Sequence, residues 1–147
     1  MGEETVDARK LEVERLIGAV REWSGGRPDV RAVGLVGSWA RGEASAESDV
    51  DLVLLAEDPA AYTESDEWAL ELGAAGVVAT RPWGVVVERR LQLAGGLEVD
   101  VAVGALSWAA TAPLDEGTAR VAGAGLVALH DPDGLLARLV DALLDRP

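Results

Sequence analysis

The feature that most constrains this fold is a pair of apolar segments joined by a glycine-containing turn. Residues 31–36 form an apolar run that ends at Gly37, which indicates a buried strand followed by a tight turn. Residues 50–55 form a second apolar run, with Asp49 and Asp51 at its start. Because side chains alternate between the faces of a strand, both carboxylates are expected on one face and their apolar neighbours on the other.

The turn has the composition of a phosphate-binding loop. Gly37 allows backbone torsions that a side chain disfavours, and Ser38 is expected to cap a short helix over residues 39–41, which Gly42 follows. Backbone N–H groups at such a turn point the same way and bind phosphate oxygens. Without acids nearby, the two glycines would be interpreted as turn residues only. The neighbouring acids favour a contact with phosphate.

Two carboxylates at strand spacing beside this turn repel each other unless a cation lies between them. Hard oxygen ligands of this kind suit Mg²⁺ that is shared with substrate phosphates. The residues therefore predict a metal–nucleotide site with Asp49 and Asp51 as ligands, rather than two solvated acids at a strand end.

The pattern Gly37-Ser38-x-x-x-Gly42, followed by Ser48-Asp49-x-Asp51-Leu52, resembles the signature of the DNA polymerase β-like nucleotidyltransferase superfamily. The similarity is to its small prokaryotic branch of minimal and antibiotic nucleotidyltransferases, and motifs support it over residues 31–103. It implies an α/β (α+β) fold, a mixed β-sheet with flanking helices like a polymerase palm. It also implies that Gly37, Ser38, Gly42 and Ser48 contact the nucleotide.

A later hairpin is expected over residues 83–103. Strand-like runs at 83–93 and 97–103 flank a three-residue loop in which Gly96 takes a left-handed conformation. This register pairs Arg90 with Asp100.

The superfamily needs a third carboxylate on a neighbouring strand, and the resemblance gives this role to Asp100. Glu98 is the substitute, because the two acids share a face and the sequence does not separate them. Arg90 and Arg41 are candidate neighbours of the site, where either would hold a carboxylate or reach a phosphate.

The resemblance implies catalysis by Asp49, Asp51 and Asp100, which would bind two Mg²⁺ ions with an NTP, ATP being the expected one. An acceptor hydroxyl would attack the α-phosphorus and release pyrophosphate.

The acceptor is left open between a partner protein and a hydroxylated small molecule such as an aminoglycoside. Minimal members resemble this chain in length, and many act as antitoxins that modify a HEPN-type helical ribonuclease, so such a partner or a homodimer would complete the pocket. The alternative is a non-catalytic binding module that masks a partner protein.

The amino-acid composition narrows the possible functions of this chain. The chain of 147 residues fits a single nucleotidyltransferase domain, 1–147. Its formal net charge of −13, from 26 acidic and 13 basic residues, disfavours nucleic-acid binding and hence a polymerase role. With no cysteine, no apolar run approaching ~18 residues and an acidic N-terminus, we expect a cytoplasmic protein without membrane association.

The remaining segments alternate between helical and strand patterns, which favours one mixed sheet with helices against it. His130 and the tryptophans, including Trp39, Trp68, Trp83 and Trp108, are expected to be structural. The expected elements are helices over 3–23, 65–72 and 135–144, a helix from 115, a loop over 60–62, and short strands over 76–80 and 126–130.

Overall fold

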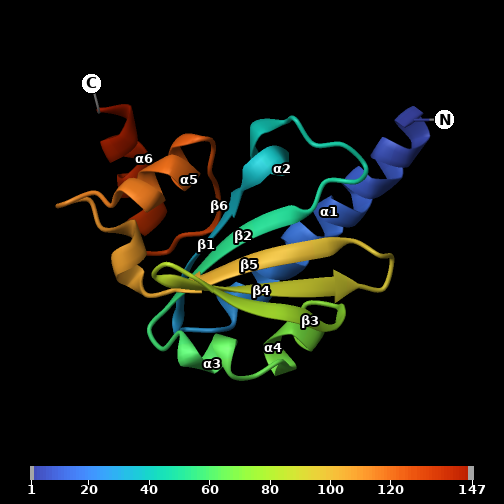
Figure 1. The fold of residues 1–147 in the computed structure, drawn as a ribbon, viewed down its shortest axis with the longest axis horizontal. Helices are drawn as coiled ribbons and strands as arrows, with labels where there is room; N and C mark the ends of the chain where they lie inside the picture. Colours follow the sequence, from blue (N-terminus) through green and yellow to red (C-terminus); the bar gives the residue numbers. More distant parts are fainter. Residues whose placement is uncertain (1, 146–147) are drawn as a thin grey trace.

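The computed structural model describes residues 2–145, with side chains described from residue 7 onward. One mixed six-stranded sheet has the order β3-β4-β5-β2-β1-β6, with helices on both faces (Figure 1). The expected α/β sheet with flanking helices is confirmed. The strands are β1 (Val30–Val36), β2 (Val50–Ala56), β3 (Ala74–Trp83), β4 (Val86–Leu93), β5 (Glu98–Gly104) and β6 (Val127–His130). The helices are α1 (Gly2–Gly25), α2 (Gly37–Arg41), α3 (Ala60–Thr63), α4 (Glu67–Glu71), the 3-10 helix η1 (Leu106–Ala109), α5 (Glu116–Gly123) and α6 (Leu135–Leu144).

The centre of the sheet joins segments that are far apart in the chain. β2 pairs antiparallel with β1 and parallel with β5, while β4 pairs antiparallel with β5. The parallel pair joins β2, which follows the Gly37 loop, to the later hairpin. This pairing brings the two halves of the expected site to one end of the sheet.

Strand alternation divides the sheet into two faces with separate cores. The first face is closed by α1, α3 and α4, and its core includes Val50, Leu52 and Leu54 of β2. The second face is partly closed by η1, α5 and α6, and its core includes Val53 and Leu55 of β2. Asp51 belongs to the second set by alternation, so its carboxylate lies on the less covered face.

The segment over residues 60–62, expected as a loop, is instead the helix α3. Tyr62 is 1% exposed and its ring lies 5.8 Å from that of Trp68 and 5.9 Å from that of Trp23. Burial of this ring against α1 and α4 stabilises a turn that the local sequence does not predict.

The hairpin register agrees with the sequence expectation. Arg90 pairs with Asp100, and Gly96 has a φ of +87° in a loop closed by a 2.9 Å bond from the Leu93 N–H to the Leu97 carbonyl. The first expected strand differs, because Trp83 ends β3 and a turn at Gly84 precedes β4. Within residues 2–145, no helix has the length and apolar character needed to cross a membrane.

Candidate active site

The turn after β1 begins the short helix α2. Gly37 has a φ of +74°, and Gly42, with a φ of +73°, ends the helix with its N–H on the Ser38 carbonyl. The expectation that Ser38 caps this helix is wrong. The helix begins at Gly37, so the extended residue before it is Val36, and no side chain caps it.

Gly37 lies directly against the carboxylate of Asp51. A Cβ atom at position 37 would stand 2.3 Å from Asp51 Oδ2, closer than any two such atoms approach. The site therefore needs glycine here for two reasons, a left-handed backbone and the lack of a side chain. The contact places the turn backbone beside the acid.

Two of the three expected acids are direct neighbours across parallel strands. Asp51 of β2 is in register with Asp100 of β5, and Asp49 immediately precedes β2. Of the two acids that the sequence left open, Asp100 is the one beside Asp51, whereas Glu98 lies two residues further toward the start of β5. The register thus favours Asp100 as the third carboxylate.

Arg90 links these acids from the neighbouring strand β4. Its guanidinium holds Asp100 through two bonds, Nε to Oδ1 at 2.8 Å and Nη2 to Oδ2 at 3.0 Å. It also reaches Glu98 Oε2 at 2.8 Å and Asp49 Oδ2 at 3.4 Å. One cation therefore pairs with three carboxylates.

Burial and mutual repulsion raise the pKa values of Asp49 and Asp51. Burial, followed by the charges of Asp100 and Asp49, raises the pKa of Asp51 to about 6. Burial also raises the pKa of Asp49, although the charge of Arg90 opposes it. Hydrogen bonds to Asp100 raise the pKa of the Arg90 guanidinium. Arg90 donates hydrogen bonds to Asp49 and Asp100 but not to Asp51. The negative charge of Asp51 is therefore the least well compensated of the three.

Comparison with protein families gives a match to the nucleotidyltransferase domain over residues 13–104, more than half of the chain. The chain belongs to this family. The matched region contains the Gly37 turn, Asp49, Asp51 and Asp100, and it ends with β5. A comparison with curated proteins found no match.

The donor set of this nucleotidyltransferase domain fits Mg²⁺. The available oxygens are carboxylates, Asp51 stands in a cradle that a side chain at Gly37 would fill, and the Arg90 guanidinium already places a cation among the acids. Among the side chains of residues 7–145, no three acidic, histidine or cysteine groups converge closely enough to enclose an ion. The fit to Mg²⁺ rests on the type of donor, because Mg²⁺ binds one or two carboxylates together with phosphates and water.

The other expected residues of the site lie around this cluster. Arg41 pairs with Glu43 through Nε to Oε2 at 3.2 Å and lines the cavity described below. The Ser48 hydroxyl accepts a hydrogen bond from the Ser45 N–H at 2.9 Å. The backbone carbonyl of Ser48 accepts one from Trp39 Nε1 at 3.2 Å. These contacts fix the loop that delivers the chain to Asp49.

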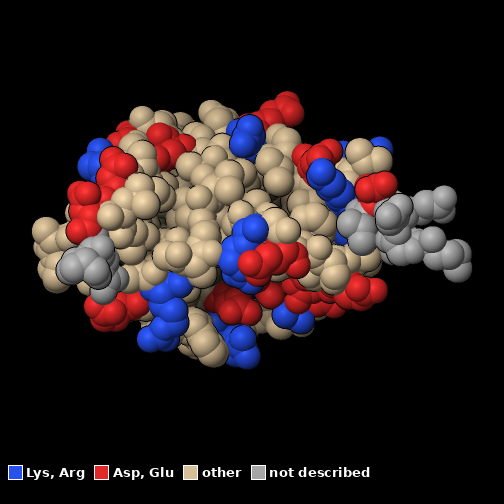
Figure 2. All heavy atoms as spheres, turned by 90° about the horizontal axis from the view of Figure 1, so that it is seen from above, with Lys and Arg blue, Asp and Glu red and all other residues tan. Residues whose placement is uncertain are grey.

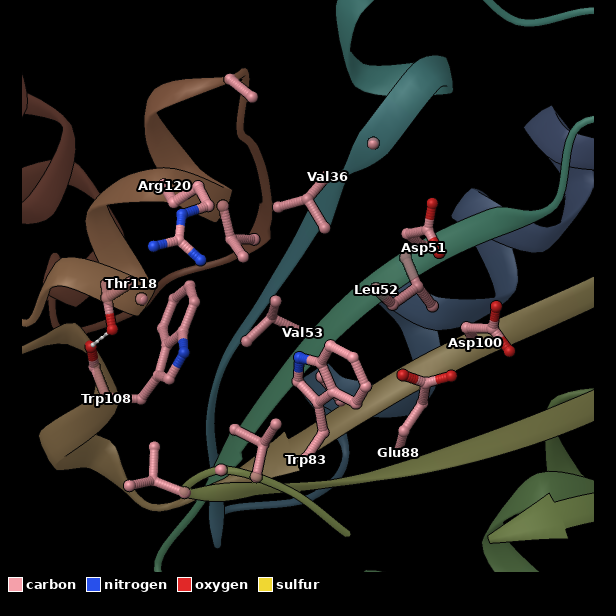
Figure 3. Close-up of a pocket in the computed structure, with 18 of the residues that line it drawn as sticks. Val36, Asp51, Leu52, Val53, Trp83, Glu88, Asp100, Trp108, Thr118 and Arg120 are labelled. Carbon is pink, nitrogen blue, oxygen red and sulfur yellow. Dashed lines mark hydrogen bonds between the residues drawn. The ribbon is translucent and has the colours of Figure 1, made fainter. Parts of the chain in front are cut away.

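A cavity of about 700 Å³ opens beside the acids on the second face of the sheet (Figure 3). Asp51 and Asp100 line one end, and Trp108, Thr118 and Arg120 line the other. The Thr118 hydroxyl donates to the Trp108 carbonyl at 2.8 Å and so fixes α5 against η1.

Sequence reasoning assigned no chemistry to the segment that supplies this far wall. The Asp115 side chain does cap α5, by accepting from the Thr118 N–H at 2.9 Å, and this local signal predicts the helix. No local signal predicts where the helix docks. The wall also lies beyond the region that matches the family.

Proposed function

We propose that this chain is a metal-dependent nucleotidyltransferase that moves a nucleoside monophosphate, AMP from ATP, to an acceptor hydroxyl and releases pyrophosphate. The observation that carries the proposal is the register of Asp51 with Asp100 beside the Gly37 turn. A turn backbone suited to phosphates and carboxylates suited to Mg²⁺ are thereby adjacent.

In this proposal Asp49, Asp51 and Asp100 hold two Mg²⁺ ions, and the backbone from Gly37 to Gly42, with Ser38 and Ser48, positions the phosphates. When bound, Mg²⁺ neutralises phosphate charge and stabilises the entering and leaving oxygens. Asp100 accepts the proton of the attacking hydroxyl. Most of the rate comes from orientation and charge neutralisation, because phosphoryl chemistry needs little covalent help from the protein.

Arg90 acts as a positioning residue. Before substrate binds, its bonds hold Asp100 and Glu98 at fixed places and offset the repulsion between the acids. Its charge would also attract a phosphate bound beside the acids, while Arg41 lines the same cavity from α2.

The acceptor is a protein hydroxyl, as on a HEPN-type helical partner, or a hydroxylated small molecule, and the protein acts in the cytoplasm. The cavity beside the acids provides space for a nucleotide and an acceptor group together. A second copy of the chain or a partner protein would cover its open side.

The test is transfer of label from ATP labelled at the α-phosphate, with Mg²⁺ and an extract of the native host. The proposal predicts a labelled product that disappears in the Asp49→Asn/Asp51→Asn variant. Asp58→Asn, an exposed acid in the loop after β2, is the matched control and should keep full transfer.

The kind of product separates the acceptor classes, because a labelled protein indicates a protein-modifying enzyme and a labelled small molecule indicates an antibiotic-modifying type. Absence of variant-sensitive label with all four NTPs would contradict the proposal. Retention of partner binding by the double variant, without any transfer, would then favour the masking module.

A further inference from the structure

Trp83 is exposed, whereas Trp68 of the core and Trp108 of the cavity wall are buried. It is 62% exposed, whereas Trp68 is 2% and Trp108 is 8% exposed. The sequence predicts a structural role for this tryptophan, and its exposure shows that it is not part of either core. Trp83 ends β3 immediately before a turn with Gly84 at a φ of +63°, and it lines the cavity beside the acids (Figure 3). Exposed aromatic groups in a cavity often mark a ligand-binding surface, so this indole is a candidate ligand contact.

The indole contacts Arg81, which lies two residues earlier on the same face of β3. The Arg81 guanidinium carbon stands 5.0 Å from the centroid of the Trp83 ring, and the same guanidinium reaches Glu88 Oε1 at 3.4 Å. Arg81 does not line the cavity. Arg81 covers one face of the ring, and the 62% exposure of Trp83 leaves the opposite face open to a ligand.

The register of the sheet gives the distance from Trp83 to the acids. Trp83 pairs with Val86, and the β4–β5 register places Val86 level with Gly104, four residues beyond Asp100 on β5. Four residues of strand span roughly 13 Å, and β3 lies two strand spacings, roughly 10 Å, from β5. The backbones at Trp83 and Asp100 are therefore roughly 16 Å apart. This is comparable with the length of an extended nucleoside triphosphate, so phosphates at Asp51 and Asp100 would leave the base near the indole.

The flat face of the Trp83 indole favours a planar ring as its partner. Charges of both signs surround it, with Glu88 beside the indole and Arg120 on α5 (Figure 3). A nucleobase carries no charge at neutral pH and offers a flat face to an aromatic ring.

We propose that the nucleobase of the bound NTP stacks on the face of Trp83 that Arg81 leaves open. This inference rests on the proposed function and adds a base-binding residue to it. Trp83 is then the group that distinguishes a nucleotide from a bare polyphosphate. The triphosphate end of the ligand remains with the Gly37 turn and the carboxylates.

The test compares two ligands by isothermal titration calorimetry with Mg²⁺, namely α,β-methylene-ATP and inorganic tripolyphosphate, which lacks a base. Trp83→Ala should weaken binding of the nucleotide at least about fivefold and leave tripolyphosphate binding unchanged. Trp83→Phe should restore most of the affinity. Val78→Ala, on the same strand at a residue that is 55% exposed and outside the cavity lining, is the matched control and should change neither ligand.

The possible failures are distinguishable. If wild type transfers label and Trp83→Ala binds the nucleotide equally well, the stacking proposal falls while the proposed function stands. Equal loss of both ligands, or an unchanged nucleotide Kd with a raised acceptor KM, would also overturn it. If wild type binds neither ligand, both proposals fail together. Thermal unfolding of each variant verifies that the hairpin remains folded.

Discussion

At the scale of single residues, Gly37 and Gly42 show how similar backbones serve different purposes. Their φ angles are +74° and +73°, but only Gly37 faces another group, the carboxylate of Asp51. No atom lies within 4 Å of a Cβ built at Gly42. A side chain at either position strains the backbone, and only one at Gly37 also displaces the acid.

The two alanine variants therefore make a matched pair. Gly37→Ala and Gly42→Ala should each lower the free energy of unfolding by about 1–3 kcal/mol through backbone strain. Only Gly37→Ala should abolish nucleotidyl transfer, because its methyl group moves the Asp51 carboxylate. Urea unfolding and the label-transfer assay measure the two effects. Equal loss of transfer in both variants would show that helix geometry, and not contact with Asp51, matters.

The raised pKa of Asp51 has a consequence for stability. Burial, then Asp100 and Asp49, raises this pKa from 3.8 to about 6, so the folded state binds the proton more tightly than the unfolded state. Its contribution is fully present below about pH 4 and is lost as pH rises through about 6. Ionised Asp51 consequently destabilises the metal-free protein at neutral pH.

Asp51→Asn should therefore stabilise the metal-free protein. In EDTA at pH 7.5 we expect a gain of about 1–2 kcal/mol in the free energy of unfolding, after allowance for the partial exposure of the carboxylate. The gain should shrink at pH 5, where Asp51 is largely protonated. Urea unfolding at both pH values measures this, with Asp58→Asn as control. A gain independent of pH would contradict the electrostatic origin.

At the scale of elements, strand β4 places two adjacent arginines on opposite faces of the sheet. Arg89 is 3% exposed and donates to the Thr63 carbonyl at 2.7 Å, to other carbonyls of the α3–α4 segment and to Asp66. It ties that segment to the sheet. Arg90 faces the acids instead, with its side chain 38% exposed.

Substitution by methionine should separate these roles. Arg89→Met should lower the free energy of unfolding by about 2–4 kcal/mol, because several carbonyls lose their donor. Arg90→Met should cost about 1 kcal/mol or less and should raise Mg²⁺ affinity, since the ion no longer competes with the guanidinium for Asp100.

Urea unfolding and calorimetric titration of Mg²⁺ check the two variants. A loss of stability in Arg90→Met as large as that in Arg89→Met would identify the acid cluster as chiefly structural. Unchanged Mg²⁺ affinity in Arg90→Met would show that Asp100 does not bind the ion.

At the scale of the whole molecule, the two faces of the sheet are covered to different extents. α1, α3 and α4 bury the first face, while η1, α5 and α6 cover part of the second and leave the acids beside an open cavity. Figure 2 shows acidic and basic side chains interspersed on the face seen from above, without a continuous basic patch. The net charge of −13 adds a long-range repulsion of phosphates.

The chain should consequently not bind nucleic acid as an acceptor. Fluorescence anisotropy with labelled single-stranded RNA and duplex DNA at about 150 mM salt should show no binding at micromolar protein, because counterion release requires a cationic surface. Tighter binding that weakens with added salt would contradict this and would add nucleic acid to the acceptor classes.

The sequence by itself determined the features that depend on local patterns. The acids of β2, the left-handed Gly37 and the pairing of Arg90 with Asp100 follow from strand alternation and from the length of one hairpin loop. Family membership follows from the same local motif.

Only the tertiary structure decided what those local units touch. The parallel pairing of β2 with β5 sets Asp51 beside Asp100, α5 docks to form the far wall of the cavity, and Trp83 lines that cavity in contact with Arg81. The physical reason is that these contacts join residues distant in the chain. Their energy comes from burying two separate cores on one sheet, which no local pattern specifies.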